Sequence, residues 1–70
     1  MSCFVHHMIN KGIFNDLGII ASEENADDLE EKIAKIVGLS GSDCSKVWEE
    51  VSRWLDNPKL RENLKSKLDQ

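Results

Sequence analysis

The clearest pattern of apolar and polar positions runs from Ser42 to Asp56, and it contains both tryptophans of the chain. Its apolar residues recur at spacings of three and four, so a helix would place them on one face. They are Cys44, Val47, Trp48, Val51, Trp54 and Leu55. Two large aromatic side chains on one face need other elements to cover them. We therefore predict a helix over residues 43–56 at the centre of a helical domain. Its predicted N-cap is Ser42, with Trp48 largely buried and Trp54 at the edge of the apolar face.

A second long helix is predicted over residues 23–37, where the apolar stripe again advances in steps of three and four. The stripe consists of Ala26, Leu29, Ile33, Ile36 and Val37. Ser22 is the predicted N-cap, and Gly38 is placed to end the helix in the left-handed conformation. Because the linker to the tryptophan helix is short, we expect the two long helices to be neighbours that pack antiparallel.

The first twenty residues are unusually apolar. Residues 2–11 predict a short helix, with Ser2 as its N-cap and Gly12 as its left-handed end. Residues 13–21 have no clean period, and their turn-forming residues predict a compact connection with at most one helical turn. So many apolar residues do not suit a solvated loop. They should either plug one end of the core or contact a second chain.

Asn57 and Pro58 predict the end of the tryptophan helix and the start of a last helix over residues 58–68. Asn is a strong N-cap, and Pro is tolerated at the first helical position, where its missing N–H would have no partner. The predicted fold is therefore all-α: one domain over residues 1–70, built as a small three-to-four-helix bundle. It has a short N-terminal helix, two long antiparallel helices and a C-terminal helix.

Composition and charge narrow the class of protein. A chain of 70 residues buries only about 60% of the surface exposed on unfolding, so its stability margin is thin. A formal charge of −4 disfavours binding to a nucleic-acid backbone, and no apolar run is long enough to span a membrane. Two cysteines are too few for a disulfide scaffold. With no signal peptide visible, we expect them to be reduced and the protein to be cytoplasmic.

The residues with most metal-binding character are Cys3, His6 and His7. On a helix Cys3 would reach His6 at i+3 and His7 at i+4, and Cys44 could be a fourth ligand if its helix docked there. These residue types suit Zn²⁺, but no CxxC or HxxxH spacing accompanies them. The alternative interpretation is two exposed histidines, one exposed cysteine and one core cysteine.

Enzymatic function is not predicted. A 70-residue helical bundle leaves little room for a substrate pocket of about 300 Å³, and the four glycines are scattered rather than gathered in a phosphate-binding loop. No cofactor is expected. The two long helices could be compared with a helix-turn-helix, but the outward face of the second is mainly acidic. The Asp-Ser-Leu order of carrier proteins is also absent, because Asp43 follows Ser42.

Acidic and basic residues are segregated along the chain. Residues 23–31 hold six acids and no base, whereas residues 59–70 hold four bases and two acids. This arrangement matches the helix dipoles, and it could also form a docking surface with complementary poles. The predicted interaction surface combines apolar and acidic residues: Phe4, Met8, Ile13, Phe14, Glu23, Glu24, Asp27 and Asp28.

We therefore predict a non-enzymatic protein-interaction or regulatory module, which acts through a partner protein or as a homodimer. The first alternative is a small zinc-type metal-binding protein that uses Cys3, His6 and His7. The second alternative, a nucleic-acid-associated regulator, is disfavoured by the charge.

Overall fold

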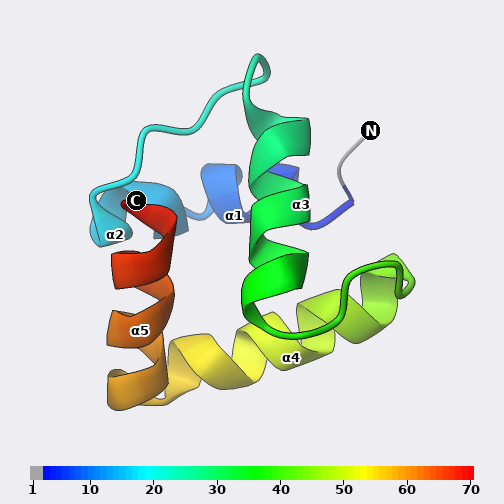
Figure 1. The fold of residues 1–70 in the computed structure, drawn as a ribbon. Helices are drawn as coiled ribbons and strands as arrows, with labels where there is room; N and C mark the ends of the chain where they lie inside the picture. Colours follow the sequence, from blue (N-terminus) through cyan, green and yellow to red (C-terminus); the bar gives the residue numbers. More distant parts are fainter. Residues whose placement is uncertain (1–2) are drawn as a thin grey trace.

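The computed structural model describes residues 3–70, which form five helices and no strand (Figure 1). The helices are α1 (Val5–Asn10), α2 (Ile13–Leu17), α3 (Ala26–Ile36), α4 (Cys44–Asp56) and α5 (Pro58–Leu68). The all-α prediction is confirmed. The predicted connection over residues 13–21 contains one short helix, α2. No helix within the described residues is long and apolar enough to cross a membrane.

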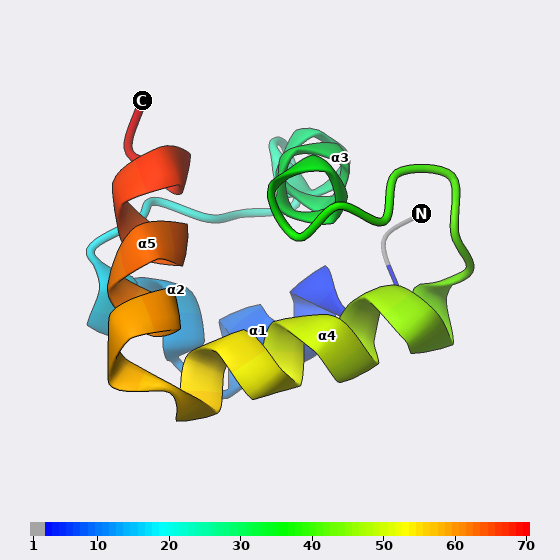
Figure 2. The same ribbon diagram turned by 60° about the horizontal axis from the view of Figure 1, so that its bottom comes forward.

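The two long helices of the prediction, α3 and α4, are not an antiparallel pair. In Figure 1, α4 runs across the lower ends of α3 and α5, and in Figure 2 α3 is seen almost end-on while α4 lies across the view. Each long helix instead packs mainly on other elements: α3 on α1 and α5, and α4 on α5. The predicted bundle of two long antiparallel helices is therefore wrong. The apolar stripes of α3 and α4 are covered by residues from both ends of the chain.

One core cluster draws on every helix. Its buried residues are Phe4, Val5, Met8, Phe14, Ala26, Leu29, Ile33, Val47, Val51, Leu64 and Leu68. Burial of apolar surface of this kind is the main force that holds a small domain together. Because Val5, Met8 and Phe14 are at most 2% exposed, the N-terminal segment plugs the core. This is the first of the two alternatives that the sequence left open.

Several predicted helix ends are confirmed by backbone geometry. Gly38 has φ of 79°, in the left-handed region, and the N–H of Leu39 donates to the Ala34 carbonyl at 2.8 Å. That pairing satisfies a carbonyl group at the end of α3. At the start of α5, Asn57 Oδ1 accepts the N–H groups of Lys59 and Leu60 at 3.0 and 3.1 Å. Asn57 is therefore the cap that the sequence predicted.

Two other caps differ from the prediction. Asp43, rather than Ser42, caps α4, and its Oδ1 accepts the N–H of Lys46 at 3.0 Å. α3 begins three residues later than predicted, because a turn occupies residues 23–25. In that turn Asn25 Oδ1 accepts the N–H of Ser22 at 2.8 Å, so Ser22 is a donor to the turn and not the helix cap. The predicted cap Ser2 lies outside the described residues.

The two tryptophans are both half-buried, which contradicts the prediction that Trp48 is largely buried. Trp48 packs on the outside of the core, with its ring stacked on Phe4 at a centroid distance of 6.1 Å. The indole N–H of Trp54 donates to Glu50 Oε2 of the same helix at 3.2 Å. The smaller Val47 and Val51 take the central positions of α4 instead.

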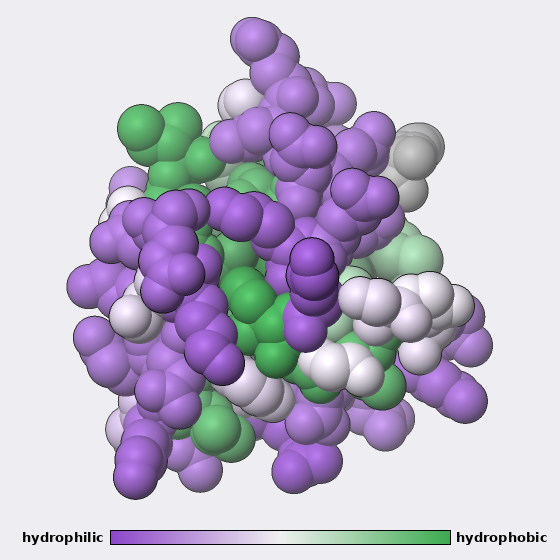
Figure 3. Space-filling model, in the orientation of Figure 1, coloured by the Kyte–Doolittle hydropathy of each residue, from purple (hydrophilic) through white to green (hydrophobic). Residues whose placement is uncertain are grey.

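The face shown in Figure 3 is mainly hydrophilic, with hydrophobic side chains visible between α3 and α5. The most exposed large apolar side chain among the described residues is Ile20, at 88%. It lies in the connection between α2 and α3, away from the core cluster. A single exposed isoleucine is ordinary for a folded domain and defines no surface by itself.

Candidate functional site around Cys3, Glu30, Cys44 and Trp48

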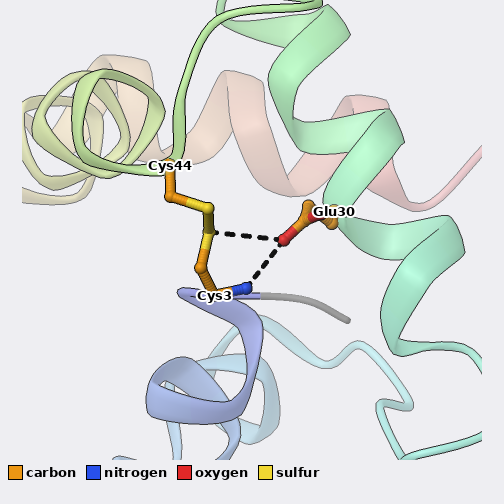
Figure 4. Close-up of side chains that lie close together, drawn as sticks. All are labelled: Cys3, Glu30 and Cys44. Carbon is orange, nitrogen blue, oxygen red and sulfur yellow. Dashed lines mark hydrogen bonds between the residues drawn. A yellow bond between two sulfur atoms is a disulfide. The ribbon is translucent and has the colours of Figure 1, made fainter.

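Cys3 and Cys44 form a disulfide, with their Cα atoms 6.0 Å apart (Figure 4). Cys3 lies just before α1 and Cys44 is the first residue of α4, so the bond fastens the start of the chain to the central helix. The expectation of two reduced thiols is therefore wrong. The pairing joins residues 41 positions apart, and no spacing motif connects them.

Glu30 extends from α3 toward this disulfide (Figure 4). Its Oε1 accepts the backbone N–H of Cys3 at 2.8 Å and lies 3.5 Å from Cys3 Sγ. A sulfur in a disulfide carries no hydrogen, so the sulfur can donate to this carboxylate only as a reduced thiol. Three segments of the chain thus meet at one point: the N-terminal segment, α3 and the start of α4.

The predicted metal ligands do not gather as a set. His6 Nε2 lies 2.9 Å from Glu23 Oε1, whereas the ring of His7 meets Trp48 edge-on at a centroid distance of 5.3 Å. Within residues 3–70, the group whose possible ligand atoms all lie within 4.8 Å of one another is Cys3, Glu30 and Cys44. Cys44 does lie beside Cys3, as its predicted place as a fourth ligand required. The third residue of the group is Glu30, however, and neither histidine belongs to it.

Sequence reasoning missed Glu30, because it stands in an acidic run whose other members face solvent. Its position on α3 gives one partial signal. Glu30 follows the buried Leu29 and precedes the exposed Glu31, so it lies at the border of the buried stripe. A half-buried carboxylate at such a border generally has a specific partner. Here the partner is the backbone of a segment 27 residues away.

Two hollows flank the disulfide. The first, of about 420 Å³, lies between α3, the turn at residues 40–42 and the start of α4. The second, of about 410 Å³, is lined by Cys3, Phe4, His7, Cys44, Ser45 and Trp48. Both hollows are larger than the pocket of about 300 Å³ for which little room was expected, and both are open to solvent. The disulfide is part of the wall of each.

Trp48 also borders a further hollow along α4, of about 340 Å³. Its lining consists of Ile13, Trp48, Ser52, Leu55, Asp56 and Arg61. Trp48 therefore borders two surface hollows, and each of them is lined by both apolar and polar side chains. No other residue of the described chain lines both.

The predicted interaction surface divides into two parts. Phe4, Met8 and Phe14 are 4%, 0% and 2% exposed, so these three side chains belong to the core and offer no contact surface in this conformation. Ile13 is half-buried and lines the hollow along α4. The four acids Glu23, Glu24, Asp27 and Asp28 are exposed, and a role for them in binding stays a prediction.

No protein-family model matches the chain, and comparisons with curated proteins and with solved structures likewise find no match.

Proposed function

We propose that this protein is a non-enzymatic interaction module that binds an apolar segment of a partner protein along α4, on both sides of Trp48. The observation that carries the proposal is the position of Trp48 between two hollows, half-buried against Phe4. Tryptophan is enriched among the residues that dominate binding energy at protein interfaces, because it offers a large rigid surface at small entropic cost.

The charge of the chain specifies the partner further. With a formal charge of −4, the module would attract a segment whose apolar anchors are flanked by Lys or Arg. The hollow along α4 has one acid and one base in its lining, Asp56 and Arg61, so the negative net charge of the chain decides which partner is attracted. A basic partner segment is therefore favoured over an acidic one and over a nucleic acid.

The disulfide supports a regulatory role for the same surface. The disulfide fixes the position of Cys3, which is next to Phe4 in the sequence. The ring of Trp48 stacks on the ring of Phe4. In a reducing compartment, disulfides are usually transient and act as switches. Oxidation would then hold the wall of the binding surface in place, and reduction would release it.

A displayed library of short peptides tests this proposal with the oxidised protein. We expect it to select peptides with an aromatic or aliphatic anchor and basic flanks. Trp48→Ala should weaken their binding at least about 30-fold, as expected for a residue worth about 2 kcal/mol in an interface. Trp54→Ala is the matched control, because Trp54 is equally half-buried but lines neither hollow, and it should change binding less than about threefold.

A second variant protects the test against loss of folding. Ser52→Arg places bulk in the hollow along α4 without removing any core atom, so it should block binding while the far-ultraviolet circular dichroism stays unchanged. Failure to select peptides, or equal binding by the Trp48→Ala and wild-type proteins, would overturn the proposal. Self-association through this face, detected by sedimentation and abolished by Ser52→Arg, would replace the partner protein with a second copy of the chain.

A further inference from the structure

We propose that the dithiol form of this protein binds one Zn²⁺ ion through Cys3, Cys44 and Glu30, with solvent in the fourth position. The site does not depend on the peptide-binding function above. It uses the three residues whose sulfur and oxygen atoms lie within 4.8 Å of one another, and these come from three separate segments of the chain. It also differs from the histidine-containing set that the sequence indicates.

The geometry is close to that of a zinc site before any metal is added. In a tetrahedral site with Zn–S of about 2.3 Å and Zn–O of about 2.0 Å, a sulfur and an oxygen ligand lie about 3.5 Å apart. Cys3 Sγ and Glu30 Oε1 are 3.5 Å apart. Two sulfur ligands lie about 3.8 Å apart in such a site, so the cysteine side chains must rotate apart once the disulfide is broken. Both cysteines are exposed, and this gives them room to rotate.

The surroundings suit an open metal site. The sulfurs and the carboxylate border a hollow of about 420 Å³ that solvent can enter, so an ion has a path in and water can take the remaining position. The backbone N–H of Cys3 donates to Glu30 Oε1 at 2.8 Å, which orients the carboxylate toward the sulfurs. Outer hydrogen bonds of this kind commonly position the ligands of metals.

The chemistry balances as two steps. A phosphine takes the oxygen of one water molecule and becomes the phosphine oxide, while the disulfide gains two electrons and two protons to give two thiols. Zn²⁺ then displaces those two protons and binds two thiolates and the ionised Glu30. The bound centre carries a net charge of −1, and two protons enter the solvent. Binding should therefore strengthen as the pH rises, because protons compete with the metal for the thiolates.

Titration with Zn²⁺ and Co²⁺ after phosphine reduction tests the site. We expect one ion per chain, a thiolate-to-cobalt charge-transfer band in the near ultraviolet, and a higher melting temperature with Zn²⁺. The oxidised protein should show none of these effects. Glu30→Gln should weaken Zn²⁺ binding at least about tenfold while it leaves both cysteines in place, and Cys3→Ser should remove the charge-transfer band.

Two control variants identify the ligands. Glu31→Gln changes the next acid along α3, which lines the same hollow but is not in the cluster, and it should change Zn²⁺ affinity less than about threefold. His7→Ala should also change it less than about threefold, whereas a tenfold loss would overturn the proposed ligand set. Absence of stoichiometric binding by the reduced protein, or equal affinity of the Glu30→Gln and wild-type proteins, would overturn the site.

Discussion

Breaking the Cys3–Cys44 bond should remove a large share of the stability of this domain. The bond joins residues 41 positions apart, and closing a loop of that length lowers the entropy of the unfolded chain by about 13 cal/mol/K. At 25 °C this corresponds to about 4 kcal/mol. A 70-residue domain has a total free energy of unfolding of roughly 4–10 kcal/mol, so the bond supplies at least about two fifths of it.

Urea denaturation followed by far-ultraviolet circular dichroism measures this contribution. We expect the Cys3→Ser/Cys44→Ser double variant and the phosphine-reduced wild type, both without added metal, to lose a similar free energy relative to the oxidised wild type. Their melting temperatures should fall by roughly 15–30 °C. Phosphine added to the double variant is the control and should have no effect. A loss below about 1 kcal/mol in both forms would refute the argument that the bond restrains the unfolded chain.

Three further substitutions test the core and the helix caps, and one of them, Ile13→Asp, is a control. Phe14→Asp should unfold the protein even in its oxidised form, because it empties a buried aromatic site and places a charge there, whereas Ile13→Asp, at a half-buried position, should leave a folded chain by circular dichroism. A folded Phe14→Asp protein would contradict the core assignment. Asn57→Ala should cost about 1 kcal/mol in urea denaturation through loss of its two capping bonds; an unchanged midpoint would show that they add no stability.

The sequence predicted local structure well because the signals for it are local. The start of α5 follows from Asn57 and Pro58 in neighbouring positions, and the end of α3 follows from Gly38, whose φ is positive. The stripe of α4 was also found, but periodicity identifies a face and not the most buried residue on it. Val51 is fully buried, whereas Trp48 is half-buried and packs on Phe4 at the outside of the core.

The arrangement of the helices could not be read in the same way. The similar apolar stripes of α3 and α4 favoured an antiparallel pair of these two helices. The apolar residues among the first twenty positions, however, also had to be buried. Packing Val5, Met8 and Phe14 into the core leaves α3 in contact with α1 and α5 and turns α4 across them. Which other helices α3 and α4 pack against depends on tertiary contacts between distant segments. A local stretch of sequence does not reveal these contacts.

The candidate site was missed for a related reason, which also explains what Cys3 and Cys44 can do. Each cysteine looks ordinary in its own segment, and Glu30 looks like one acid among six. Cys3, Cys44 and Glu30 come together only in the folded chain. A bond that joins them therefore requires the N-terminal segment to be packed in place. A disulfide and a zinc ion would both tie the N-terminal segment to α4 and keep Phe4 beneath Trp48. The metal-free dithiol form lacks both ties. It is therefore the form in which the N-terminal segment should open first, with the largest effect on the surface beside Trp48.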